Sequence, residues 1–207
     1  SEAIEPVLRF TDPPRPVGQK EAFVSYAWKE EASSDPDRHG KVEEFCRRVA
    51  DAGLTGIRDV EAMRTGDRIS EFMRRIGNSD RVFVILSDAY LKSPYCMNEL
   101  LLLWRTSGDD DTRFQDRIRV FTLPGTEIYT TSDRLEWALY WKRERERIEK
   151  QMAEIGAADI GVSTIREFKR IRDFAHDVTD ILAHVTDVLL TGDFDEFVER
   201  AIEELPE

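Results

Sequence analysis

Short apolar runs and amphipathic stretches alternate along the first 125 residues of the chain. Apolar and β-branched runs predict strands at residues 22–26, 54–59, 81–87 and 118–124. Between them, apolar positions at helical spacing predict helices at about 41–52, at about 69–76 and from residue 94 onward. This alternation is typical of an α/β fold in which helices cover both faces of a parallel sheet.

The pattern changes after Pro124, where long charged helical stretches replace the alternation. Residues 132–155 and 163–190 are rich in Arg and Glu at i,i+4 spacing, and Asp193 begins a last short helix. Within the first stretch, one helical face carries three aromatic side chains, Trp137, Tyr140 and Trp141. This face either packs against the sheet or serves as a lid or a partner surface.

The predicted elements suggest one domain with two parts. Residues 1–20 contain several Pro residues and show no periodicity, so we expect an irregular N-terminal arm. We expect residues 21–207 to form a single domain, with an α/β core at 21–125 and a helical C-terminal elaboration at 126–207.

The charge balance and the cysteine usage narrow the class of protein. A net charge of −12 argues against direct nucleic-acid binding and against attachment to a membrane surface. No apolar run is long enough to span a membrane and the first residues do not resemble a signal peptide, so we expect a cytoplasmic protein. Cys46 and Cys96 have apolar helical neighbours and no metal-ligand spacing, which predicts buried free thiols and no metal site.

Several sites of known chemistry are missing from the sequence. Neither GxGxxG, GxxxxGK[ST] nor GxSxG occurs, which excludes the motif-bearing forms of the Rossmann fold, the P-loop and the α/β-hydrolase. A receiver domain needs an acidic pair after its first strand, where this chain has SYAW. The acidic run at Asp109–Asp111 is interpreted as a solvated loop rather than a cation site, within a polar loop at 107–116.

Parallel sheets bind ligands at the carboxyl ends of their strands, which points to the segments after the first and third strands. The second of these segments contains SPYCMNEL, in which Ser93 and Pro94 predict the start of a helix. Tyr95 and Glu99 are four residues apart and would share one face of that helix. An aromatic ring beside a carboxylate suits cleavage of an N-glycosidic bond, although an ordinary surface pair has the same spacing.

The motifs AFVSYAW, VFVILSDAY and SPYCMNEL, in this order, resemble a Toll/interleukin receptor (TIR) domain of the bacterial type over about residues 20–125. The resemblance implies a flavodoxin-like three-layer sandwich with a central parallel sheet, to which this chain adds an extended helical C-terminal part. It also implies an NAD⁺ glycohydrolase that releases nicotinamide and forms ADP-ribose or a cyclic isomer. NAD⁺ is then the substrate, with no further cofactor and no metal.

The resemblance also assigns roles to individual residues. It makes Glu99 the catalytic carboxylate and Tyr95 the aromatic residue that stacks on the substrate. Substrate-binding positions would lie after the first strand and in the loop after the second, at Ser25, Tyr26, Ala27, Trp28, Asp59 and Arg64. Three of them have plainer interpretations: Trp28 as a cap on the core, Asp59 as a loop or helix cap, and Arg64 as a solvated side chain.

Partners follow from the same resemblance. It implies self-association through TIR–TIR contacts, which would activate the enzyme, and a sensor domain or subunit outside this chain. An assembly-activated effector in bacterial antiphage defence or signalling would fit these features. The alternative is a non-enzymatic TIR–TIR interaction or adaptor module, or one that mimics host TIR domains; the presence of Glu99 favours the enzyme.

Overall fold

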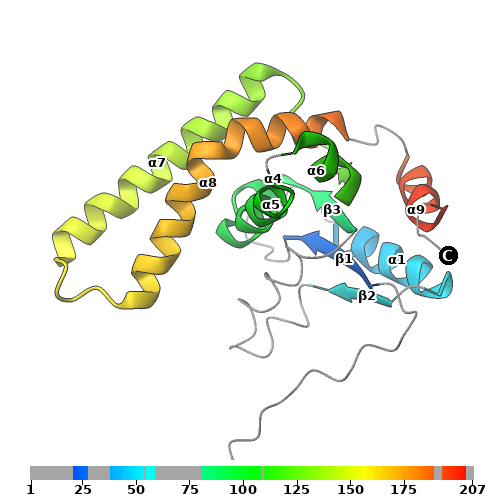
Figure 1. The fold of residues 1–207 in the computed structure, drawn as a ribbon, viewed down its shortest axis with the longest axis horizontal. Coiled ribbons are helices and arrows are strands. Elements are labelled where there is room, and N and C mark those ends of the chain that lie inside the picture. Colours follow the sequence, from blue (N-terminus) through cyan, green and yellow to red (C-terminus); the bar gives the residue numbers. More distant parts are fainter. Residues whose placement is uncertain are drawn as a thin grey trace, which may run out of the picture.

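The computed structural model describes residues 21–27, 38–53, 55–58, 81–108, 110–188 and 193–203. Its centre is a parallel sheet of four strands in the order β2-β1-β3-β4 (Figure 1). The strands are β1 (Glu21–Tyr26), β2 (Thr55–Arg58), β3 (Val82–Leu86) and β4 (Ile118–Thr122), which confirms the four predicted strands. The order reverses between β1 and β3, and such a switch point is where open α/β sheets bind ligands.

Helices α1 (Arg38–Asp51) and α9 (Phe194–Glu203) cover one face of the sheet (Figure 1). Their apolar sides and the sheet residues that point toward them form one buried cluster. The four positions that predicted helix α1 are all buried in it, namely Val42, Phe45, Cys46 and Val49. Cys46 and Cys96 are both free and buried, as the sequence predicted.

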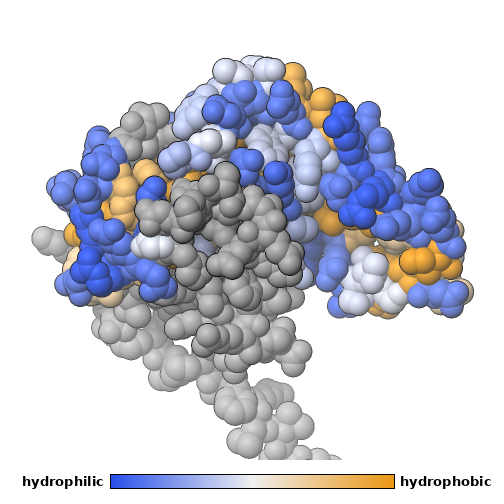
Figure 2. Space-filling model, turned by 180° about the vertical axis from the view of Figure 1, so that it is seen from behind, coloured by the Kyte–Doolittle hydropathy of each residue, from blue (hydrophilic) through white to orange (hydrophobic). Residues whose placement is uncertain are grey.

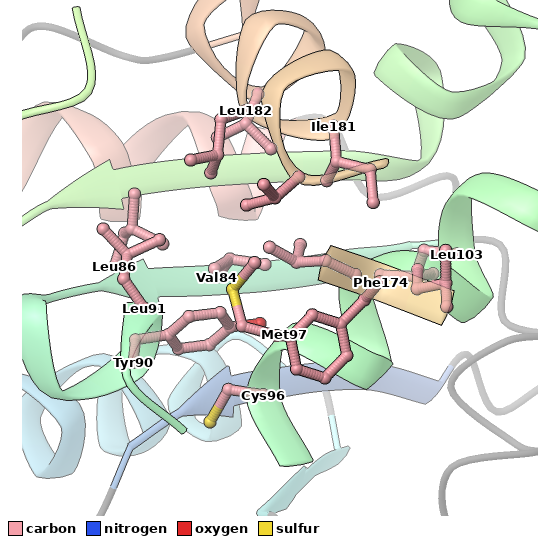
Figure 3. Packing of buried hydrophobic residues seen from close by; sticks show 14 of the residues in the cluster. Val84, Leu86, Tyr90, Leu91, Cys96, Met97, Leu103, Phe174, Ile181 and Leu182 are labelled. Carbon is pink, nitrogen blue, oxygen red and sulfur yellow. The ribbon is translucent and has the colours of Figure 1, made fainter. Parts of the chain in front are cut away.

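The opposite face carries α4 (Asp88–Leu91), α5 (Pro94–Thr106) and the second half of α8 (Val162–Asp187). Successive side chains of a strand point to opposite faces, so β3, which is buried throughout, contributes to both cores. Figure 3 shows the cluster on this face, where Val84 and Leu86 of the strand meet helical residues such as Met97 and Phe174. Two helical layers around a parallel sheet confirm the predicted flavodoxin-like three-layer sandwich.

Helices α7 (Thr131–Ile155) and α8 form a long hairpin that extends beyond the sheet (Figure 1). Trp141 is buried at 2% exposure beside Leu91 of α4 and Phe174 of α8, and Trp137 and Tyr140 pack against the same cluster, so this aromatic face packs into the core. At the far end α7 stops at Gly156, whose φ of 89° favours glycine. Apolar side chains are exposed at that end and are visible in Figure 2; they include Ile155, Val162 and Ile165.

A short helix, α6 (Asp111–Arg117), lies where the sequence predicted a polar loop, so that prediction is wrong in this part. The Asp110 carboxylate caps the helix by accepting from the Arg113 backbone N–H at 3.1 Å, and Phe114 is fully buried. The acidic run therefore starts a helix, and one buried aromatic residue fixes that helix to the core.

Two further predictions fall outside the described residues: the arm at 1–20 and the helix at about 69–76. The proposed boundary between the core and the helical elaboration, near residue 125, stays a prediction. In the parts of the chain that the structure describes, no helix is both long enough and apolar enough to cross a membrane.

Candidate active site

Strand β1 carries Ser25 to the carboxyl edge of the sheet. Ser25 pairs in register with Val84 of β3, so it lies at the switch point between these two strands. Its side chain is fully buried and points toward the layer of α4 and α5, because it contacts side chains of both helices. A polar side chain thus lies at the position where the fold predicts a ligand.

Helix α5 brings Glu99 to the same place. The helix begins as predicted: the Ser93 hydroxyl accepts from the Cys96 backbone N–H at 3.3 Å, and Pro94 occupies the first turn. Glu99 is only 1% exposed, although glutamate is rarely buried in proteins unless it is paired. Its depth excludes the solvated surface position that the plainer interpretation requires and makes it a candidate functional residue.

The Ser25 hydroxyl donates a hydrogen bond to Oε2 of Glu99. The same Ser25 oxygen lies 2.8 Å from the hydroxyl of Tyr90, a residue of α4. A buried carboxylate is costly without hydrogen bonds, so these hydroxyl groups help to hold Glu99 in place. The result is a line of three buried polar groups from three elements: Tyr90 of α4, Ser25 of β1 and Glu99 of α5.

Tyr95 and Glu99 differ in environment although they share a helical face in sequence. Tyr95 is 37% exposed, whereas Glu99 is buried. A helical side chain covers the turn before its own Cα, so Tyr95 in the first turn extends past the start of the helix. The alternative of an ordinary surface pair is therefore not found, because the ring is accessible and the carboxylate is buried.

The residues at the end of β1 and just after it do not all face Glu99. Tyr26 is buried in the cluster with α1 and α9, on the other face of the sheet from Glu99. Its side chain points away from Glu99, because neighbouring strand residues point to opposite faces, and its role in substrate binding stays a prediction. Ala27 is buried in the cluster on the α5 side. Trp28, Asp59 and Arg64 lie outside the described residues.

Tyr90 is the site residue to which the sequence assigned no role. It lies within the motif VFVILSDAY, four residues after the end of β3, and it is fully buried. A tyrosine a few residues after a strand that ends at a switch point can indicate a residue of the site, but a tyrosine that only packs in the core gives the same pattern. Its contact with Ser25 favours a role in the site.

Among the residues that the structure describes, no group of three or more His, Cys, Asp and Glu side chains is arranged to hold a metal ion. The described site combines a buried carboxylate with two hydroxyl groups. Such a group can stabilise a cation that develops on a bound sugar, and it can orient the hydroxyl groups of that sugar.

Comparisons with known proteins agree with the fold. A family model described as a TIR domain matches residues 22–153, which is more than half of the chain. A protein of Brachypodium distachyon named "Probable 2' cyclic ADP-D-ribose synthase BdTIR" is 43% identical over 60 residues. That match covers 27% of this chain and 25% of the plant protein.

A solved structure gives a longer but more distant match. The TIR domains in the activated Roq1 resistosome that recognises the effector XopQ align with a TM-score of 0.55 and 15% identity. The alignment covers 90% of this chain and 99% of that chain. At this level of identity the likeness supports the fold alone.

Proposed function

The chain belongs to the TIR-domain family, and from this premise we propose that it is an enzyme that cleaves the bond between nicotinamide and ribose in NAD⁺. The observation that carries the proposal is Glu99, a buried carboxylate held by Ser25 at the switch point of the sheet. The name of the plant relative, a probable 2' cyclic ADP-D-ribose synthase, supports chemistry on a nucleotide of this class. Products would be nicotinamide and ADP-ribose or a cyclic isomer.

In the proposed mechanism a carboxylate stabilises the developing positive charge, and no general acid has to protonate the leaving group. When the C–N bond breaks, its electron pair goes to the cationic pyridinium nitrogen, and nicotinamide leaves as a neutral molecule. The positive charge moves to the ribose, where Glu99 would stabilise it and orient the sugar hydroxyl groups. Water then attacks the ribose and loses a proton; in a cyclising reaction an atom of the same molecule attacks instead.

The other predicted site residues have unequal support. The accessible Tyr95 fits a stacking role on a planar ring of the substrate. Ser25 fits a role beside the carboxylate, because it already contacts Glu99. Roles for Ala27, Trp28, Asp59 and Arg64 in substrate binding stay predictions from the family resemblance. NAD⁺ is the only small molecule that the proposal requires.

Burial of Glu99 has a consequence for regulation. A carboxylate with 1% exposure must become accessible before it can act on a substrate. We therefore expect weak activity from single chains, with self-association through TIR–TIR contacts as the activating event. The structural neighbour is described as part of an activated resistosome, which is the kind of assembly meant here. A role in antiphage defence stays a prediction.

The test is nicotinamide release from NAD⁺ at high protein concentration, for the parent chain and for Glu99→Gln. We expect release by the parent and a loss of at least about a hundredfold in the variant, since removal of a charge that stabilises a transition state has effects of this size. Glu136→Gln, an exposed change on α7, is the matched control and keeps parental activity. Chromatography of the second product separates hydrolysis from cyclisation.

Two results would contradict the proposal. One is a parent that releases no nicotinamide even when its chains are tethered together. The other is equal release by the parent and by Glu99→Gln. The first would favour a non-enzymatic adaptor, whose binding to other TIR domains does not depend on Glu99.

A further inference from the structure

Tyr90 is a buried polar residue that the proposed mechanism has not yet used. The side chain is fully buried, and Figure 3 shows its ring among apolar residues that include Leu91 and Met97. Its hydroxyl lies 2.8 Å from the Ser25 oxygen. A phenol hydroxyl in such surroundings is unfavourable unless it forms a hydrogen bond, so the contact with Ser25 matters for its placement.

Counting hydrogen atoms fixes the direction of this contact. An ionised carboxylate only accepts, so the single hydroxyl hydrogen of Ser25 goes to Glu99 Oε2. The Ser25 oxygen has then no hydrogen left to offer, and Tyr90 must be the donor in the bond between the two hydroxyl groups. With Glu99 ionised, the three groups form one directed chain: Tyr90 donates to Ser25, and Ser25 donates to Glu99.

The backbone around Tyr90 is held from two sides. The Ser87 hydroxyl, at the cap of α4, accepts from the Tyr90 backbone N–H at 3.1 Å. At the next residue, the indole N–H of Trp141 donates to the Leu91 carbonyl oxygen at 2.9 Å. The α7 helix thereby helps to fix the segment that carries Tyr90. A hydroxyl group fixed in this way has a defined position before any substrate binds.

We propose that Tyr90 is a positioning residue, which orients the Ser25 hydroxyl and through it the Glu99 carboxylate for cleavage of NAD⁺. The inference rests on the proposed function of the same site. Tyr90 does not touch the reacting atoms; it acts because hydrogen bonds in a chain reinforce one another and because a carboxylate stabilises the developing charge best from one orientation. Its removal should therefore lower kcat and leave KM unchanged.

The experiment compares steady-state nicotinamide release by four forms of the chain: the parent, Tyr90→Phe, Ser25→Ala and the double variant. Tyr90→Phe keeps the ring and removes only the hydroxyl. We expect it to lower kcat by about tenfold, the size of one lost hydrogen bond. If Tyr90 acts only through Ser25, the double variant is no slower than Ser25→Ala alone.

Two controls separate positioning from a general loss of structure. Tyr129→Phe makes the same chemical change at a tyrosine that is 46% exposed, and it keeps the parental kcat. Ser25→Thr retains a hydroxyl group between Tyr90 and Glu99, and we expect it to keep more activity than Ser25→Ala. Thermal unfolding of every variant shows which of them are folded. If Tyr90→Phe does not fold, the comparison of Ser25→Thr with Ser25→Ala still tests the series of hydrogen bonds that runs through Ser25.

The outcomes distinguish this inference from the proposed function. The positioning role is overturned if Tyr90→Phe keeps the parental kcat or raises KM instead. It is also overturned if the loss of kcat in the double variant equals the product of the losses in Tyr90→Phe and Ser25→Ala. The same holds if Ser25→Thr is as slow as Ser25→Ala. In each of these cases the parent still releases nicotinamide and Glu99→Gln does not. A parent without any release overturns the proposed function and the positioning role together.

Discussion

Among the described residues of the proposed site, Tyr95 is the most exposed. It stands in the first turn of α5 and is 37% exposed, while Glu99 of the same helix is buried. An aromatic ring that stacks on a nucleotide base contributes about 1–3 kcal/mol to binding. Tyr95 is thus expected to act on substrate affinity, in contrast to Glu99, which is expected to act on the rate of bond cleavage.

The prediction is a separation of KM and kcat. Tyr95→Ala should raise the KM for NAD⁺ by about tenfold, since this factor corresponds to about 1.4 kcal/mol of lost binding. Tyr95→Trp retains a platform and should stay near the parental KM. Tyr129→Ala, the same change at another exposed tyrosine, serves as the control. A parental KM in Tyr95→Ala would contradict the stacking role, as would an equal rise in the control.

Neighbouring residues show what can be predicted about the site from sequence and what cannot. The motif around Glu99 pointed to this carboxylate, and the predicted strand at 22–26 pointed to the edge of the sheet where Ser25 lies. Alternation along β1 alone separates Ser25 from Tyr26, because the two side chains must face opposite layers. The hydrogen-bonded chain through Tyr90 could not be predicted, since it depends on how α4 packs beside β1.

At the scale of elements, helix α7 begins with a pair of reciprocal hydrogen bonds. The Thr130 hydroxyl accepts from the Asp133 backbone N–H at 3.1 Å, and the Asp133 carboxylate accepts from the Thr130 backbone N–H at 2.7 Å. This is a capping box with Asp in the position usually taken by Glu. The bond from the Thr130 backbone is the main cause that lowers the pKa of Asp133, with further lowering by the Thr130 side chain.

Stability should therefore depend on pH through Asp133. Because its pKa is lower in the folded state than in the unfolded one, its contribution is complete above the unfolded pKa of about 4 and is lost as the pH falls through the folded value. Asp133→Asn should lower the free energy of unfolding at pH 7, and the difference from the parent should shrink in acid. Urea unfolding of both proteins at pH 7 and pH 3 measures this difference in the free energy of unfolding.

Two further variants define this effect. Thr130→Ala removes the side-chain cap of the same helix and should cost about 1 kcal/mol at pH 7. Asp159→Asn removes an exposed carboxylate from the turn after α7 and serves as the matched control. If the loss in Asp133→Asn were equal at both pH values, the carboxylate would not be the stabilising group.

Helices were predicted from sequence with unequal success, and their length explains the difference. The long helices α7 and α8 have many turns of consistent spacing, and their observed bounds lie within a few residues of the predicted ones. Helix α6 has seven residues and one buried apolar side chain, Phe114, so no period could be seen in it. Its start was nevertheless marked by an aspartate in a capping position, three residues before the N–H that it binds.

For the whole molecule, the net charge of −12 bears directly on the proposed activation by self-association. Two copies repel each other over a distance set by the ionic strength. The screening length is about 30 Å at 0.01 M salt and about 8 Å at 0.15 M. Low salt should therefore keep the chains apart, and physiological salt should allow contacts between their surfaces, including the apolar end of the α7–α8 hairpin.

We expect the specific activity of nicotinamide release to depend on protein concentration. Nicotinamide release per chain should rise with protein concentration, and the rise should begin at a lower concentration in 0.15 M salt than in 0.01 M salt. Sedimentation velocity under the same conditions shows whether larger species appear together with activity. Glu99→Gln should sediment like the parent while it stays inactive, which separates assembly from catalysis. If activity per chain is the same at all concentrations, Glu99 becomes accessible within a single chain, and assembly is not the step that exposes it.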